Sequence, residues 1–264
     1  MAKRAVCVGI NDYPGTNSDL KGCVNDAKDW ADALTSRGYD VKLLLDAQAT
    51  LKGMVGALDD LVGKAAAGDS LVFTYSGHGS WLPDDNGDEP DGRDEMLCPH
   101  DIDQEQYLMD DMLAEIFSRK PKGARLYFIS DSCHSGSVAK FAADPIGGKD
   151  RMPKIRLLPP LEFVKDPDIR AKIPIAVNAP ATAGGEKYPA LLVAGCKDVE
   201  FSYDADFGGR ANGAMTRAAL EALKQNPATP QDWFKAIRKH LPSQQYPQTP
   251  QLFGGSTAKK GPMF

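Results

Sequence analysis

Residues 71–79, LVFTYSGHG, and residues 126–136, LYFISDSCHSG, decide the fold of this 264-residue chain. Each stretch is a continuous apolar run that ends in small residues carrying a histidine or a cysteine. Continuous apolar runs are typical of strands buried on both faces, as in a parallel sheet. Similar runs cover residues 5–10, 41–45 and 190–194, and a weaker one covers 251–253. The sequence therefore predicts a mainly parallel sheet of six strands.

Helical patterns lie between these runs. Apolar residues repeat at spacings of three and four from Leu20 to Leu34, and looser repeats follow at 51–67, 111–118, 214–223 and 231–241. Alternating strands and helices predict an α/β fold with helices flanking the sheet. Residues 142–189 are rich in Pro, Gly, Lys and Arg and have no clean period. We interpret them as an insertion or linker between a larger half, 1–141, and a smaller half, 190–264, of one domain.

Composition excludes several classes of protein. With 42% hydrophobic and 25% charged residues the chain is typical of a soluble globular domain. No apolar run approaches the roughly 18 residues of a membrane span, and the start lacks a secretory signal, so we expect a cytoplasmic protein without membrane contact. The five cysteines are odd in number and scattered, which favours free thiols in a reducing compartment.

The net charge of −5 is concentrated in one stretch. Residues 84–95 hold seven acids and one arginine and are expected to form a long acidic loop. Such a loop attracts a cation or a basic peptide, and the absence of a basic stripe argues against a nucleic-acid partner.

His78 and Cys133 follow two neighbouring strands of the predicted sheet. The carboxyl ends of parallel strands meet at one edge, so both side chains are expected in the same crevice. An imidazole beside a thiol takes its proton during nucleophilic attack, and the amides of Gly79 and Cys133 are placed to stabilise an oxyanion. This pattern predicts a thiol nucleophile with a histidine base.

Two other interpretations of these residues stay open. A single cysteine at a strand end is often only a small core residue, and His134 is a rival base. Zinc binding by Cys98, His100, His78 and either Cys133 or His134 is a further alternative, although zinc ligands are usually more closely paired.

The residues around this pair resemble the motifs of a known family. Residues 75–79 and 131–137 are similar to the His and Cys motifs of the metacaspases, which are caspase-like cysteine peptidases. Further similar segments follow in the family's order at 22–27, 91–101, 110–111, 194–198, 212–216 and 248–252. The resemblance covers nearly the whole chain except 142–189, and favours a bacterial-type, single-domain member.

The resemblance implies a fold, an activity and a site. The implied fold is the caspase-like three-layer sandwich, a mainly parallel six-stranded sheet between helices. His78 would be the base and Cys133 the nucleophile of an endopeptidase that cuts after Arg or Lys. The specificity pocket would be formed by Cys23, Asp26, Ser76 and Asp131. Carboxylates in such a pocket pair with a guanidinium or ammonium group and repel an acidic side chain.

The resemblance also implies that calcium is an activator and that no cofactor is required. Asp94, Asp110 and Asp111 match three of the family's carboxylate ligands, but Lys140 stands where the fourth is expected. A cation in place of a ligand predicts weak binding. The acidic stretch is not an EF-hand, because Glu89 occupies the position that requires glycine.

Self-cleavage is a further expectation. Residues 142–189 offer cuts of the implied type after Lys149, Arg151, Lys154, Arg156, Lys165, Arg170 and Lys172. If the segment is exposed and mobile it would be cut; if Leu157, Leu158, Leu161 and Phe163 dock it on the sheet, it would stay whole. We expect a monomer that acts on peptide or protein substrates. A catalytically silent interaction module and a thiol hydrolase of different specificity are the alternatives.

Overall fold

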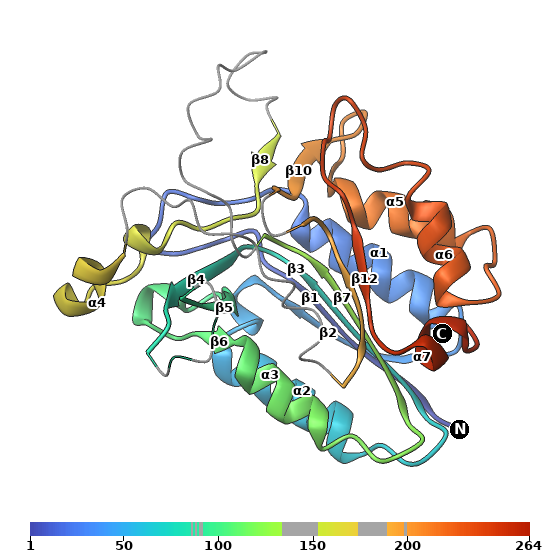
Figure 1. Cartoon of the computed structure of the whole chain (residues 1–264). Helices are drawn as coiled ribbons and strands as arrows, with labels where there is room; N and C mark the ends of the chain where they lie inside the picture. The colour runs from blue at the N-terminus through green and yellow to red at the C-terminus, as the bar shows by residue number, and fades with distance from the viewer. Residues whose placement is uncertain (86, 88, 90–91, 134–152, 174–188, 198–199) are drawn as a thin grey trace.

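The computed structural model describes residues 1–264 except 86, 88, 90–91, 134–152, 174–188 and 198–199. Its central sheet has six strands in the order β12-β9-β7-β3-β1-β2 (Figure 1). These strands are β1 (Lys3–Gly9), β2 (Asp40–Leu45), β3 (Ser70–Ser76), β7 (Arg125–Asp131), β9 (Leu191–Ala194) and β12 (Gln251–Phe253). All neighbours are parallel except β9 and β12, which confirms the predicted α/β sheet.

Helices cover both faces of this sheet (Figure 1). One face carries α1 (Cys23–Thr35), α5 (Ala214–Leu223) and α6 (Pro230–Ile237), and the other carries α2 (Leu51–Gly63) and α3 (Asp110–Ser118). Side chains alternate along each strand, so Phe73 and Tyr75 enter the core under α2 and α3, whereas Val72 enters the core under α1 and α5. None of the described helices is long and apolar enough to cross a membrane.

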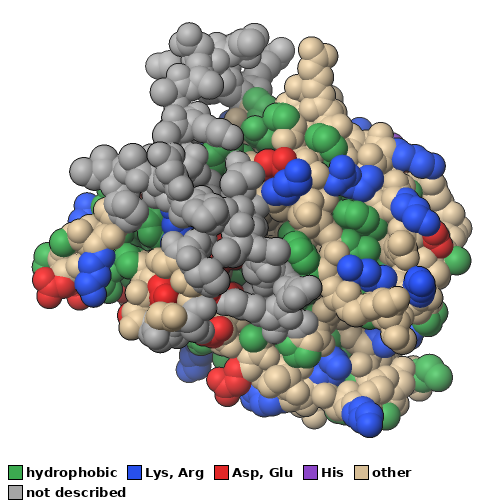
Figure 2. Space-filling model, viewed as in Figure 1, with side chains coloured by type: hydrophobic (Ala, Val, Ile, Leu, Met, Phe, Trp, Pro, Cys, Tyr) green, Lys and Arg blue, Asp and Glu red, His purple; other side chains and the backbone are tan. Residues whose placement is uncertain are grey.

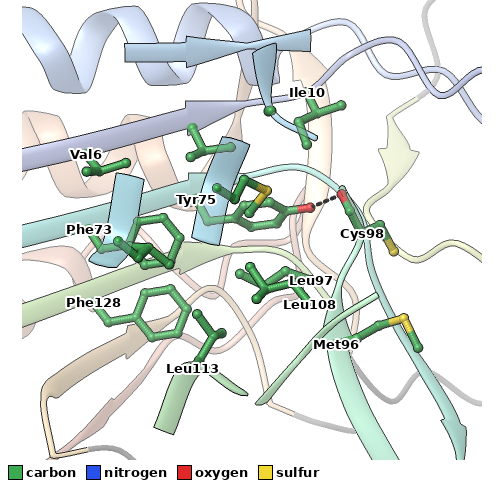
Figure 3. Packing of buried hydrophobic residues seen from close by; sticks show 14 of the residues in the cluster. Val6, Ile10, Phe73, Tyr75, Met96, Leu97, Cys98, Leu108, Leu113 and Phe128 are labelled. Carbon is green, nitrogen blue, oxygen red and sulfur yellow. Dashed lines mark hydrogen bonds between the residues drawn. The ribbon is translucent and has the colours of Figure 1, made fainter. Parts of the chain in front are cut away.

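Aromatic side chains pack along β3 and β7 as far as the carboxyl ends of these strands. The rings of Phe73 and Phe128 stack with centroids 5.0 Å apart. Further along β3, the Tyr75 hydroxyl donates a hydrogen bond of 2.9 Å to the Cys98 carbonyl oxygen (Figure 3). The same hydroxyl lies 2.6 Å from the carbonyl oxygen of His78. The turn after β3 is therefore held against the core.

The expected acidic loop at 84–95 connects the two strands of a hairpin: its described residues up to 92 lie in neither helix nor strand, and 93–95 belong to the second strand. The two strands are β4 (Gly79–Pro83) and β5 (Arg93–Leu97), which pair antiparallel and are joined by β6 (Leu108–Met109) in a small sheet. The guanidinium of Arg93 lies over the Trp81 ring, 4.5 Å from its centroid. This contact anchors β5, whose acidic residues are more typical of a loop than of a strand.

A second small sheet lies at the carboxyl end of the central strands. It contains β8 (Lys154–Ile155), β10 (Tyr203–Asp206) and β11 (Ala211–Gly213). The short helices α4 (Pro167–Lys172) and α7 (Ser256–Lys260) complete the described elements of helix and strand. On the face that Figure 2 shows, the described Lys and Arg side chains are dispersed among other side chains.

Residues 153–173 dock on the molecule. Arg156 and Leu158 are completely buried, and Leu157 and Phe163 nearly so, whereas Leu161 is 48% exposed. This part of the segment is therefore docked rather than exposed; that a docked segment stays whole remains a prediction. The candidate cleavage positions Lys149 and Arg151 lie outside the described residues.

Candidate active site

The two predicted catalytic residues lie at the same edge of the sheet. β3 and β7 are parallel neighbours, and their last residues, Ser76 and Asp131, face each other in register. His78 and Cys133 each follow two residues later, and both side chains are buried. His134, the rival base, lies outside the described residues.

Both residues flank one carbonyl group, that of Arg156. The amide of Gly79 donates to this carbonyl oxygen at 3.0 Å, and the amide of Cys133 donates at 3.1 Å. The amide of Arg156 donates in turn to the Ser202 carbonyl oxygen at 3.0 Å. Just before it, β8 pairs antiparallel with β10. An extended piece of the chain thus crosses the edge of the sheet with one carbonyl held by two amides.

The Arg156 side chain fills an acidic pocket. Its Nη2 lies 2.6 Å from Oδ2 of Asp26 and 3.0 Å from Oδ1 of Asp204. Its Nη1 donates to Ser76 Oγ at 2.6 Å and lies 3.2 Å from Oδ2 of Asp131. A completely buried guanidinium requires such partners, because an unpaired buried charge is very costly. The pocket is therefore built for a cation.

Backbone groups hold the pocket carboxylates in place. The amide of Gly213 donates to both oxygens of Asp26 at 3.0 Å, and the amide of Thr216 donates to Asp131 at 2.8 Å. The amide of Lys21 donates to Asp204 at 2.7 Å. Two of these donors lie at the start of α5 and the third lies before α1, so segments far apart in the sequence hold the acids in place.

The charges in the pocket shift one another's pKa values. Burial raises the pKa of Asp26 to about 6, against the opposing effect of Arg156. Burial alone would lower the pKa of Arg156, but attraction by Asp131, the neighbouring Cys23 and the other acids raises it well above its usual value. The guanidinium therefore stays charged in the pocket.

Of the predicted pocket residues, Asp26, Ser76 and Asp131 contact Arg156 directly, and Cys23 is buried beside them. Sequence reasoning missed Asp204, and it named Arg156 as one of several cleavage positions without placing it in the pocket. Asp204 lies in the alternating stretch YDAD, which resembles a half-exposed strand. The pairing of β10 with both β8 and β11 places it in the pocket.

The environment of His78 leaves one ring nitrogen available as a base. Nε2 lies 2.6 Å from the Ser18 carbonyl oxygen, which can only accept, so this nitrogen carries the hydrogen. Nδ1 is buried and has no hydrogen-bond partner among the described residues. Burial lowers the pKa of His78 to about 4, although its hydrogen bond to Ser18 acts in the opposite direction. The ring is therefore neutral near pH 7.

The sulfur of Cys133 lies in a small apolar cluster. Its Sγ accepts a hydrogen bond of 2.6 Å from the Ser202 amide and lies 4.0 Å from the Sγ of Cys196. Leu157 and Phe201 complete the cluster.

The residues expected to bind calcium lie around a separate hollow. Asp94, Asp110 and Asp111 line a cavity of about 440 Å³ that also contacts Asp85 and Lys172. Burial, with the nearby charges of Asp111 and Asp94, raises the pKa of Asp110 to about 7. Lys140 lies outside the described residues.

A tighter acid cluster lies at one side of that hollow. Asp84, Asp85 and Asp94 each place an oxygen within 4.8 Å of the others. Among the described residues, no other group of three or more acids, cysteines or histidines lies close enough together to hold one ion. The alternative zinc ligands Cys98, His100, His78 and Cys133 do not form such a group, and His134 lies outside the described residues.

The sequence relatives of the chain identify its family. Residues 3–142 match the family model of the metacaspase, peptidase C14 domain. Over 95% of its length the chain is 36% identical to Metacaspase-1A of Aspergillus fumigatus and 35% identical to Metacaspase-1 of Coccidioides immitis. The chain belongs to the metacaspase family of cysteine peptidases, which act on peptides or proteins. It spans 68% and 61% of these two relatives.

Solved structures show the same fold. A protein of Geobacter sulfurreducens, 27% identical, superposes with a TM-score of 0.73 over 99% of this chain and 98% of that one. Caspase-1 of Spodoptera frugiperda, 12% identical, superposes with a TM-score of 0.57 over 96% and 86% of the two chains. The expected caspase-like fold is confirmed.

Proposed function

We propose that this chain is a cysteine endopeptidase that cleaves after Arg or Lys, with Cys133 as nucleophile and His78 as base. One observation carries the proposal: Arg156 lies with its guanidinium among three carboxylates and its carbonyl oxygen on the amides of Gly79 and Cys133. An arginine just before a bond to be cleaved would lie in this way.

The residues support a defined sequence of steps. His78 is neutral, and its Nδ1 has no partner in the described part of the chain; this nitrogen takes the thiol proton as Cys133 attacks the carbonyl carbon. The negative charge that develops on the carbonyl oxygen is stabilised by the two amides, which already point at it. His78 then returns the proton to the leaving amine, and water hydrolyses the thioester.

The pocket also supports a preference within the basic residues. The planar guanidinium of Arg156 reaches separate acids through Nη1 and Nη2. A lysine ammonium is a single point charge and cannot bridge them in the same geometry. We therefore expect both residues to be accepted, with arginine preferred.

Occupation of the pocket by Arg156 makes the described state latent, and it singles out one bond for self-processing. Among the described candidates Lys154, Arg156, Lys165, Arg170 and Lys172, Arg156 has its carbonyl at the dyad. We propose that the chain is cut between Arg156 and Leu157, and that other substrates bind when Arg156 leaves the pocket.

Intact mass and N-terminal sequencing test this assignment. The unmodified protein is expected to yield a new N-terminus at Leu157, and Arg156→Lys should keep this cut at a lower rate. Arg156→Gln should lose it, because an uncharged amide leaves the acids without a cation. Arg170→Gln, a change of the same kind in the docked segment, should leave the cut in place. Cleavage confined to Lys165, Arg170 or Lys172 would overturn the assignment.

Calcium modulation is also part of the proposal. The all-oxygen donor set fits calcium, since Asp84, Asp85 and Asp94 place their oxygens close together and Asp110 and Asp111 line the adjoining hollow. Lys172 lines the same hollow and opposes a cation. We expect weak binding, with a dissociation constant of roughly 10⁻⁴ to 10⁻³ M.

Calcium affinity is expected to rise with pH. The pKa of Asp110 is raised to about 7, so this carboxyl is largely protonated at pH 6 and ionised at pH 8. Binding must release that proton and should be tighter at pH 8 by up to roughly tenfold. Calorimetry at both pH values measures this, and Asp110→Asn should abolish the difference. Equal affinities in the unmodified protein would contradict a role for Asp110.

A further inference from the structure

The residues after the Arg156–Leu157 bond are anchored in the core. Leu158 is completely buried among the residues that pack beneath α2 and α3. Its amide donates to the Gly79 carbonyl oxygen at 3.0 Å, and its carbonyl oxygen accepts from Ser80 Oγ at 2.7 Å. Leu157 is 3% exposed and packs with Cys133.

The chain beyond Leu158 stays attached to the molecule. Phe163 and Val164 belong to the same core cluster as Leu158, and the Phe163 ring lies 5.7 Å from that of Tyr107. Glu162 accepts a hydrogen bond of 2.8 Å from Ser18 Oγ. None of these contacts depends on the bond between Arg156 and Leu157, so cleavage alone does not free the Leu157 side.

The other side of the bond is held as well. Arg156 keeps its acidic pocket whether or not the bond is intact, and β8 keeps its pairing with β10. Resting on the proposed function, we propose that Gly79 and Ser80 form a leaving-group site that retains Leu157 and Leu158 after cleavage. Residues 154–158 then act as an internal, reversible inhibitor.

The chemistry of the reversible cut is balanced within the chain. Attack by Cys133 forms the Arg156 thioester and breaks the bond to Leu157, whose amine takes the proton carried by His78. If that amine stays in place, it attacks the thioester, re-forms the peptide bond and returns the proton to the sulfur through His78. Water competes, giving the Arg156 carboxylate and the free thiol.

Retention of the Leu157 amine beside the thioester favours re-formation of the peptide bond. A reactant held in the right geometry has an effective concentration of roughly 10⁵ M or more in well-oriented systems. A leaving amine that diffuses away has no such advantage. The retained carboxylate can likewise re-form the thioester with loss of water. The cut and uncut chains should therefore reach an equilibrium.

Incubation of the full-length protein in H₂¹⁸O tests the proposal. Hydrolysis places ¹⁸O in the Arg156 carboxylate, and resynthesis carries part of it into the carbonyl of the uncut chain. We expect the cut fraction to stop short of completion, and the uncut chain to gain 2 Da in the peptide containing Arg156. Cys133→Ala should show neither change.

Weakening the leaving-group site should shift this equilibrium. Ser80→Ala removes the hydrogen bond to the Leu158 carbonyl and is expected to raise the ratio of cut to uncut chain about 2- to 10-fold, the range for one lost hydrogen bond. Leu158→Ala should act in the same direction. The control is Ser70→Ala, which removes an equally buried hydroxyl bonded to Tyr39 at 2.7 Å on β3 and should leave the ratio unchanged.

The outcomes separate this proposal from the proposed function. Complete, one-way cleavage with no label in uncut chain overturns the leaving-group site while leaving the peptidase intact. No cut and no label, in a protein that hydrolyses arginine peptides, overturns it too. If arginine peptides are not hydrolysed either, the proposed function fails with it.

Discussion

Cys133→Ala is expected to abolish both the hydrolysis of arginine peptides and the cut after Arg156. Without the sulfur no thioester forms, and loss of a nucleophile in comparable peptidases costs several orders of magnitude in rate. We expect a decrease of at least about a thousandfold in kcat, measured with a fluorogenic arginine peptide. The fold should persist, because alanine fills most of the small apolar site.

The neighbouring thiol provides a matched control. Cys196 lies 4.0 Å from Cys133, in the same cluster, and is also buried. Cys196→Ala should retain most activity, since the amides that donate to the Arg156 carbonyl oxygen belong to Gly79 and Cys133. If Cys196→Ala is inactive and Cys133→Ala is active, the nucleophile has been misassigned.

Asp26→Asn is expected to cause the second large loss. The substitution keeps the shape but removes a buried charge that lies 2.6 Å from a guanidinium nitrogen. Breaking a buried ion pair costs about 3–5 kcal/mol, which corresponds to a loss of roughly 100-fold to several thousandfold in kcat/KM for arginine peptides.

Asp29→Asn is the control on the same helix. Asp29 lies one turn further along α1, is partly exposed and pairs with Arg210 at 2.6 Å. An exposed pair contributes little, so this variant should keep kcat/KM within about twofold. Equal losses in both variants would show that the effect comes from helix destabilisation rather than from the pocket.

The framework of the fold could be predicted because its signals are local. Continuous apolar runs mark the six central strands, and the spacing of residues such as Leu20, Val24 and Ala27 marks the helices between them. The hairpin of β4 and β5 was missed because its connecting residues are acidic and rich in turn-forming types. Its pairing depends on tertiary contacts such as that of Arg93 with Trp81.

Part of the candidate active site could be predicted for a different reason. Parallel topology brings strand ends together, so His78 and Cys133 could be placed at one edge from the sequence. The pocket position of Arg156 could not, because an arginine in a stretch rich in Pro, Lys and Arg resembles a solvated residue. Its burial requires acids from α1, β7 and β10, which are far apart in the sequence.

The most direct test is the hydrolysis of four peptides that differ only in the residue before the cleaved bond: Arg, Lys, Asp and Leu. The acidic pocket predicts that kcat/KM follows the order Arg, Lys, then Leu and Asp, with Arg exceeding Asp by at least about a hundredfold. Cys133→Ala protein in parallel removes any contribution from contaminating peptidases. Hydrolysis of the Asp or Leu peptide as fast as the Arg peptide would contradict a pocket built for a cation.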